Sequence, residues 1–186
     1  MSRLILASES PQRRAILGAL GVKFEVVAPG VEEVEVGDPE AVAIENARRK
    51  ALAVEAPGAT IIGCDTLVAL GGEIFGKPDD EAQARVYLAA LAGRAHQVHS
   101  GLAVARDGRV RVAHVVTQVV FGAIEEQMLD WYIGTGEWRG RAGGCDIQGA
   151  GGVLVERIDG DYLNVVGLPT RALLELEPGL LHDHAG

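Results

Sequence analysis

The chain of 186 residues suits one domain or two closely joined lobes, and its 48% hydrophobic content is ample for a buried core. Its 17 Lys and Arg residues against 26 Asp and Glu residues give a formal charge of −9, which argues against nonspecific binding to a nucleic-acid backbone. Cys64 and Cys145 have the spacing of neither a disulfide framework nor a zinc site, and no stretch resembles a signal peptide or a membrane span, so the cytoplasm is the predicted compartment.

The first predicted elements are a short strand over the apolar run Leu4 to Ala7 and a helix directly after it. Ser10 is the expected N-cap of this helix, Pro11 its first residue and Gly21 its stop. Arg13 falls in the first turn, where the helix dipole makes an uncompensated cation cost roughly 0.3–1 kcal/mol. A bound anion would reverse the sign of that effect.

The start of this helix therefore indicates a site for an oxyanion. A helix N-terminus offers free N–H groups to phosphate, and Ser8, Ser10 and Arg13 add hydroxyl and guanidinium donors. The helical period places Arg13 at the mouth of the apolar face and Arg14 in solvent. The alternative is that both arginines are surface charges paired with Glu9 or another acid.

A second strand is predicted over Phe24 to Ala28, and a second helix opens at Asp38-Pro39 and runs to about Val54. Lys50 lies on this helix beside a stripe of small residues, so its ammonium is expected to look toward the sheet. The stripe consists of Ala43, Ala47 and Ala51.

The next apolar run, Thr60 to Cys64, predicts a strand buried on both faces that ends at Asp65. Open α/β sheets usually bind ligands at that position. The carboxylate of Asp65 there can bind Mg²⁺ or accept a proton from an attacking water, whereas the alternative is a turn aspartate that caps its neighbours. Glu33 is the candidate second metal ligand, although Glu32 or Glu35 would serve on composition alone.

The remaining elements are predicted from turn and cap signals. They are a hairpin over Thr66 to Phe75, a helix from Pro78 to about Leu91, paired strands over Val98 to Ala105 and Val110 to Phe121, a helix over Glu125 to Ile133, a strand pair over Val153 to Ile158 and Tyr162 to Val166, and a last helix from Pro169. The glycine-rich stretch from Gly134 to Gly152 is too long for an idle connection. Lys77, held between Gly76 and Pro78, is a point charge suited to phosphate, unless it and Lys50 are solvated surface lysines.

Taken together, these groups describe a cation-lined pocket with two carboxylates and a divalent metal, suited to a polyphosphate. The sequence has no P-loop motif and no persuasive Ser-His-Asp or Cys-His arrangement, and its five histidines show no zinc-ligand spacing. Metal-assisted attack of water on a phosphoryl group is therefore the predicted reaction class.

The chain resembles the Maf-like nucleoside triphosphate pyrophosphatases. Their pattern Leu-Ala-Ser-x-Ser-Pro-Arg-Arg is matched over Leu6 to Arg13, with Gln12 in place of the first arginine. The likeness runs nearly end to end. It includes Glu33, Ala47-x-x-Lys50-Ala51, Gly63-x-Asp65-Thr66, Gly76-Lys77-Pro78, Thr117-x-Val119-x-Phe121, Ala142-Gly143, Ile147-Gln148-Gly149 and Val165-Val166-Gly167-Leu168-Pro169. Each piece is short, and their order and spacing together are specific.

The resemblance implies an α/β fold of the inosine-triphosphatase-like type, with an elongated mixed sheet flanked by helices and a single Maf-like domain over residues 1–186 whose two packed lobes enclose a central cleft. It implies hydrolysis between the α and β phosphates to a nucleoside monophosphate and pyrophosphate, with Mg²⁺, Mn²⁺ or a similar ion. By match to the family motifs, Asp65 would be the proton acceptor and Glu33 would help to hold the metal. The phosphate ligands would be Ser8, Arg13, Lys50 and Lys77.

Base preference follows from three positions. In the branch that resembles dTTP/UTP pyrophosphatases they carry Arg, Thr and Gln, whereas here they carry Gln12, Thr66 and Gln148. The branch that acts on 7-methyl-GTP carries Trp, Gln and Glu and matches at none of them, so a pyrimidine is expected. An amide such as Gln148 can both donate to and accept from the edge of thymine or uracil, although it could equally satisfy loop backbone groups.

A rival interpretation is a regulator of cell division or septum formation that binds a triphosphate without hydrolysing it. A sensor has no need of a base such as Asp65 beside a metal, which favours the enzyme. Apolar strand surface in the second half of the chain would allow a homodimer, as the family analogy suggests.

Overall fold

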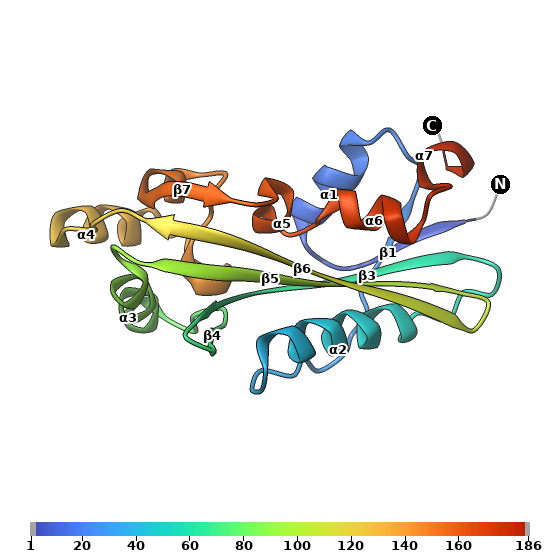
Figure 1. Cartoon of the computed structure of the whole chain (residues 1–186), viewed down its shortest axis with the longest axis horizontal. Coiled ribbons are helices and arrows are strands. Elements are labelled where there is room, and N and C mark those ends of the chain that lie inside the picture. The colour runs from blue at the N-terminus through green and yellow to red at the C-terminus, as the bar shows by residue number, and fades with distance from the viewer. Residues whose placement is uncertain (1–2, 185–186) are drawn as a thin grey trace.

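The computed structural model describes residues 3–184 and folds them around one mixed sheet (Figure 1). The strands are β1 (Leu4–Ala7), β2 (Glu25–Val27), β3 (Thr60–Leu70), β4 (Glu73–Phe75), β5 (Ala95–Arg106), β6 (Arg109–Phe121) and β7 (Val155–Asp159). The helices are α1 (Pro11–Ala19), α2 (Pro39–Leu52), α3 (Glu81–Leu91), α4 (Glu126–Thr135), α5 (Tyr162–Val166), α6 (Thr170–Leu176) and α7 (Leu180–Asp183), with 3-10 turns over Ala142–Gly144 and Ala150–Leu154. The sheet order is β2-β1-β3-β5-β6-β7, and β4 pairs with β3.

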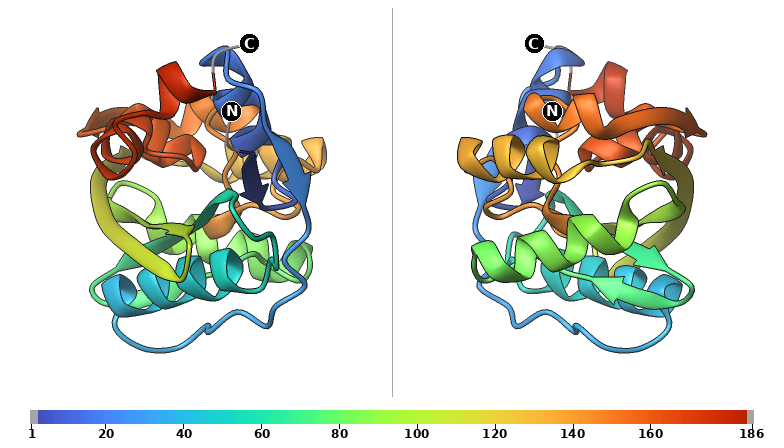
Figure 2. Two further views of the ribbon diagram at one scale, coloured as in Figure 1. Left: turned by 90° about the vertical axis from the view of Figure 1, so that its right-hand side faces the viewer. Right: turned by 90° about the vertical axis from the view of Figure 1, so that its left-hand side faces the viewer.

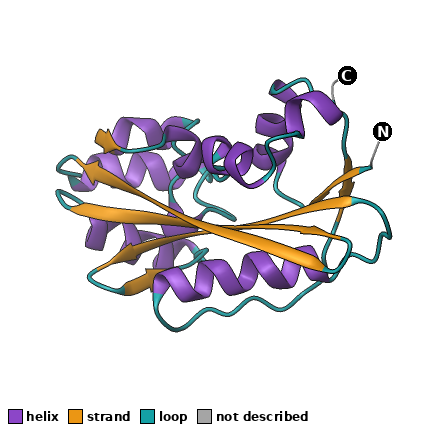
Figure 3. Cartoon of the chain, turned by 45° about the vertical axis from the view of Figure 1, so that its right-hand side comes forward, coloured by secondary structure: helices purple, strands orange, loops and turns teal. Residues whose placement is uncertain are grey.

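The long strands β5 and β6 run along the whole sheet, and helices cover both of its faces (Figure 2). Helices α2 and α3 lie on one face, while α1, α5 and α6 lie on the other, which Figure 3 shows from a third direction. The predicted α/β class, an elongated mixed sheet flanked by helices, is confirmed. Within residues 3–184, no helix has both the length and the apolar character that crossing a membrane requires.

One edge of β3 is left open in its middle. Strand β1 pairs in parallel with β3 only as far as Ala7 opposite Gly63, and β4 pairs antiparallel with β3 only from Phe75 opposite Val68. In the described part of the chain, the four residues of β3 between these two partners therefore have no strand neighbour on that side. Successive side chains of a strand point to opposite faces, so Asp65 and Thr66 both reach this gap, from opposite faces of the sheet.

Helix α2 lies unusually close to the sheet because both surfaces lack bulk. A Cβ added at Gly63 would collide with the backbone of Ala47 and Ala51, and one added at Gly101 would collide with the backbone of Ala43. The predicted small-residue stripe is thus the face that packs on β3 and β5. Asp38 caps the start of α2 by accepting a hydrogen bond from the Ala41 N–H at 3.0 Å.

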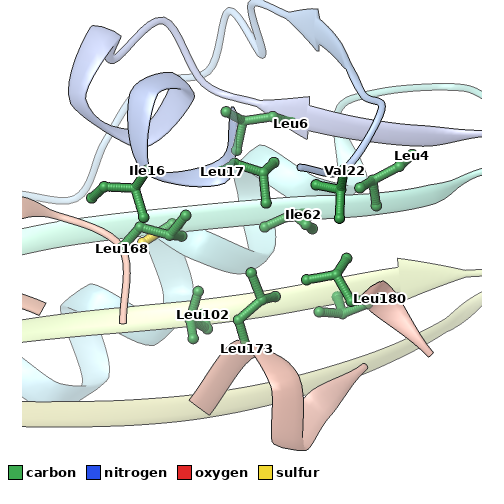
Figure 4. Packing of buried hydrophobic residues seen from close by; sticks show 12 residues of the cluster. Leu4, Leu6, Ile16, Leu17, Val22, Ile62, Leu102, Leu168, Leu173 and Leu180 are labelled. Atoms are coloured by element: carbon green, nitrogen blue, oxygen red, sulfur yellow. The ribbon is translucent and has the colours of Figure 1, made fainter. Parts of the chain in front are cut away.

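Hydrophobic clusters lie toward the two ends of the sheet. Figure 4 shows the first, in which Leu6, Leu17, Ile62, Leu102 and Leu173 join β1, α1, β3, β5 and α6. The second cluster joins α3, α4 and the far ends of β5 and β6. Its fully or nearly fully buried members include Leu88, Val98, Phe121, Tyr132 and Leu154.

Two predicted elements differ from the structure. The segment Tyr162–Val166 was predicted to be a strand, and this is wrong because it forms helix α5. The Asp161 carboxylate caps that helix by accepting from the Leu163 N–H at 2.8 Å, and the buried amide of Asn164 donates to the Val98 carbonyl at 3.0 Å. The strand before it, β7, pairs instead with the end of β6. The third strand is also longer than predicted, since β3 continues without a break into the hairpin as far as Leu70.

Candidate active site

A cavity of about 410 Å³ opens at the gap in the edge of β3 and extends along the face of the sheet that carries α1 and α5. Its walls come from the turn between β1 and α1, the loop after β2, helix α2, strand β3 and the glycine-rich loop that follows α4. Nine of the residues predicted from the sequence line it. They are Ser8, Ser10, Gln12, Arg13, Glu33, Lys50, Asp65, Thr66 and Lys77.

Arg13 is buried in this cavity and held in one orientation. Its Nε donates to the Gly167 carbonyl at 2.8 Å, its Nη1 to the Ser8 hydroxyl at 3.2 Å and its Nη2 to the Thr66 hydroxyl at 3.1 Å. A guanidinium has five N–H groups, so two remain for a ligand. None of its partners is a carboxylate, and the charge of Arg13 is therefore left open to an anion.

The two serines of the turn are used differently. The Ser8 oxygen accepts from Arg13 and from the Ser10 N–H at 3.2 Å, which leaves its own proton free to donate. The Ser10 oxygen accepts from the Arg13 N–H at 3.4 Å as the N-cap of α1 and lies 3.3 Å from the Gln12 side-chain oxygen. Ser10 thus shapes the start of the helix, while the hydroxyl hydrogen of Ser8 remains available to a ligand.

Lys50 connects two carboxylates across the gap. Its Nζ lies 2.6 Å from an oxygen of Asp65 and 2.6 Å from an oxygen of Glu33. The other Asp65 oxygen accepts from the Asn46 amide at 2.9 Å. Asn46 also accepts from the Val34 N–H at 2.7 Å and donates to the Val34 carbonyl at 2.9 Å, which fixes the loop that carries Glu33.

These contacts keep Asp65 ionised. Burial alone would raise the pKa of its carboxyl, but the Lys50 ammonium, with smaller contributions from Arg13 and Asn46, outweighs burial, and the pKa lies below its usual value. Lys50 is thus shared between two acidic side chains, Asp65 and Glu33. The site therefore pairs a group suited to a divalent cation with Arg13, which is suited to an anion.

The specificity residues predicted from the sequence are not all in one place. Thr66 supports Arg13 and shares a hydrogen bond of 2.8 Å with the Ser100 hydroxyl. Gln12 is half-buried at the cavity, whereas Gln148 is exposed and does not line it. The backbone N–H of Gln148 donates to the Asp146 carboxylate at 3.1 Å, which fixes this part of the loop. Lys77 is exposed at the cavity, and no salt bridge to it is found within residues 3–184.

The cavity wall and the groups directly behind it also include polar residues that the sequence analysis did not select as site residues. Arg141 and Asp146, both from the glycine-rich loop, form an ion pair at 2.9 Å in its wall. Asn46 lies one helical turn before Lys50 on the face of the small-residue stripe, which is the signal that could have identified it. His96 lines the cavity beside Val98 and Val119, and nothing in the local pattern separates it from a core residue.

Comparisons with known proteins identify the family of the chain. The sequence model of a family described as Maf-like protein matches residues 3–177. A protein of Pyrococcus furiosus named dTTP/UTP pyrophosphatase is 41% identical over 182 residues, which are 95% of this chain and 94% of that protein. Proteins with the same name from Pyrococcus horikoshii and Deinococcus radiodurans are 44% and 43% identical, over 93% and 95% of this chain and 94% and 92% of their own lengths.

Proposed function

The chain belongs to the Maf-like protein family, and from this membership and the geometry of the cavity we propose that it is a metal-dependent nucleoside triphosphate pyrophosphatase acting on dTTP and UTP. The observation that carries the proposal is the convergence of Arg13 and Lys77 with the carboxyl groups of Asp65 and Glu33 at one gap in the sheet. The names of the similar proteins supply the substrate class.

The proposed reaction is the attack of water on a phosphorus so that the bond between the α and β phosphates breaks. The products are a nucleoside monophosphate and pyrophosphate. Asp65 accepts the proton of the attacking water, because it is ionised and lies at the open edge of β3. The two free N–H groups of Arg13, the Ser8 hydroxyl and Lys77 bind phosphate oxygens and neutralise the charge that builds on the leaving group.

The acidic residues of the site fit a small divalent cation. Mg²⁺ in proteins is usually bound by one or two carboxylates together with water and substrate phosphates. Glu33 and Asp65 each place an oxygen within 2.6 Å of the same ammonium, so their carboxylates are close enough to share one ion. Such an ion would polarise the phosphoryl oxygens and lower the pKa of a bound water.

The preference for a pyrimidine is part of the proposal and is supported by the names of the relatives, since Gln148 lies outside the cavity and Thr66 supports Arg13. Two departures from the family pattern count against this preference: Gln12 replaces the arginine of the dTTP/UTP branch, and Cys145 and Asp146 replace the tyrosine and glycine that commonly precede Ile-Gln-Gly in the family. A homodimer and a cytoplasmic location stay predictions from the sequence.

The experiment is a substrate panel of dTTP, UTP, CTP, GTP and 7-methyl-GTP with Mg²⁺ or Mn²⁺, measuring pyrophosphate release. We expect the highest kcat/KM with dTTP or UTP and no release after treatment with a chelator. Binding of triphosphates without release of pyrophosphate would overturn the enzyme in favour of a nucleotide-sensing regulator. A highest rate with 7-methyl-GTP would overturn only the base preference.

A further inference from the structure

We propose that the imidazole of His96 is a specificity-determining residue that hydrogen-bonds the edge of the nucleobase, an inference that rests on the proposed nucleotide substrate. Of the specificity residues predicted from the sequence, Thr66 lies beside Arg13 and Gln148 lies outside the cavity. His96 is only 4% exposed, and its Nδ1, which is itself buried, makes no hydrogen bond of good geometry among the described residues, although the Arg94 backbone lies close enough to affect the ring.

His96 lies at a suitable distance from the phosphate-binding groups. It stands four residues along β5 from Ser100, whose hydroxyl bonds Thr66 beside Arg13. At about 3.3 Å per residue this is about 13 Å along the strand. A sugar can lie between a base at His96 and phosphates at Arg13, and one continuous cavity joins the two places.

The surroundings of His96 suit a flat ring. Its cross-strand neighbour is Val119, and Val98 follows it on the same face of β5. Phe121 meets the imidazole edge to face with ring centroids 4.6 Å apart, and Val155 from β7 adds a further apolar side chain to the cavity wall. Apolar walls with one placed polar group are the usual composition of a small-molecule site, in which the polar group fixes the orientation.

The protonation state of His96 allows it to interact with either kind of base atom. Burial lowers its pKa to about 4, with the Arg94 backbone opposing the shift, so the imidazole is neutral near pH 7, with one nitrogen that donates and one that accepts. The edge of uracil or thymine offers carbonyl oxygens and an N–H group. Of the other unsatisfied buried side-chain atoms, those of Thr60 and Asn164 belong to residues that do not line the cavity.

Three variants test the role of the two imidazole nitrogens. His96→Leu removes both nitrogens, His96→Asn retains a polar atom close to the position of Nδ1, and His96→Gln retains one close to the position of Nε2. We expect His96→Leu to raise KM for UTP and dTTP about tenfold, the loss expected for one hydrogen bond, with kcat changed less than threefold. The amide that places a polar atom at the nitrogen facing the base should recover KM to within threefold of the original protein, so His96→Asn and His96→Gln together identify that nitrogen.

Binding at the phosphate groups of the site is measured separately, with inorganic tripolyphosphate as a competitive inhibitor. Its inhibition constant in all three variants should stay within twofold of the value for the original protein. His99→Leu is the matched control, because His99 is a buried histidine of the same strand that does not line the cavity. It should leave KM for UTP and dTTP within twofold of the original protein. Thermal unfolding and circular dichroism identify any variant that fails to fold, and the asparagine and glutamine variants then provide the comparison.

The inference is overturned if His96→Leu leaves KM for UTP and dTTP within twofold of the original, or if tripolyphosphate inhibition weakens in parallel with KM. If the protein hydrolyses no triphosphate at all, the proposed function fails while this inference is still tested. In that case calorimetric titration with UMP and dTMP replaces KM, and equal affinities of the original protein and His96→Leu would overturn the role of His96.

Discussion

Arg13 and Lys50 are both buried cations, but their surroundings prepare them for different tasks. Lys50 is 6% exposed and touches two carboxylates, which compensate its charge within the protein. Arg13 is 9% exposed and touches only neutral oxygens. Because an uncompensated buried charge is costly, the arrangement around Arg13 is explained best by an anion that binds there.

Substitution of Asp65 tests the proton acceptor. Asp65→Asn keeps the shape of the side chain and a contact for Lys50, but an amide cannot take a proton from water. We expect kcat to fall by about 10² to 10⁴, the usual contribution of a general base, while nucleotide affinity and the circular dichroism spectrum are retained. Steady-state pyrophosphate release and calorimetric nucleotide binding measure the two quantities. Unchanged turnover would remove Asp65 from this role.

Substitution of Arg13 tests whether its geometry matters beyond its charge. Arg13→Lys keeps the positive charge, but one ammonium cannot reproduce the fork that reaches Gly167, Ser8 and Thr66 together. We expect kcat/KM to fall 10- to 100-fold. Arg14→Lys is the matched control, since Arg14 is exposed on the next position of the same helix turn, and it should change kcat/KM less than twofold. Equal effects of the two substitutions would contradict the prediction.

At the scale of elements, the site depends on the close approach of α2 to the sheet. The glycines of β3 and β5 and the alanines of α2 remove the side-chain bulk between them, so that the side chains of Asn46 and Lys50 reach Asp65. The gap left between β1 and β4 then exposes the same carboxylate at the sheet edge.

Gly63→Ala tests this dependence. The new methyl group would collide with backbone atoms of α2, which cannot move aside as a flexible side chain would. We expect a loss of about 1–3 kcal/mol in the free energy of unfolding and a fall in kcat/KM of at least tenfold, because α2 must shift and take Lys50 with it. Gly18→Ala, where nothing lies within 4 Å, is the control and should stabilise α1 by about 0.5–1 kcal/mol. Activity close to normal in Gly63→Ala would show that this close packing does not position Lys50.

Elements that depend on local signals were predicted from the sequence, whereas features that depend on contacts between distant segments were not. The starts of α1 and α2 were predicted correctly because Ser10 and Asp38 act locally, through caps within three residues. The segment Tyr162–Val166 was predicted wrongly because its apolar run was read as a strand, although Asp161 caps a helix and Asn164 binds across to β5. The position of His96 in the cavity depends on contacts between distant segments, which no local pattern reveals.

For the whole molecule, the formal charge of −9 is compatible with a site for an anion because Arg13, Lys50 and Lys77 line one cavity. Basic side chains that bind one small anion need only be close to one another. The surplus of acids keeps the rest of the surface unattractive to polyanions such as nucleic acid. A compact polyphosphate can approach only where Arg13, Lys77 and a counter-cation offset that field.

Protonation of the buried His96 makes the stability of the whole molecule depend on pH. The pKa of His96 is about 4 in the folded protein and about 6.5 in an unfolded chain. Between these values the unfolded chain binds more protons, so stability rises with pH through this window and is lost as the pH falls from 7 toward 4. The loss from His96 is about 2 to 3 kcal/mol between pH 7 and pH 4.5.

His96→Leu lacks this contribution. Between the two pH values, the free energy of unfolding in guanidinium should therefore decrease by that much less in His96→Leu than in the original protein. The exposed His182→Gln should retain the full decrease, since its side chain meets water in both states, and identical decreases in His96→Leu and the original protein would show that His96 is not buried in its neutral form.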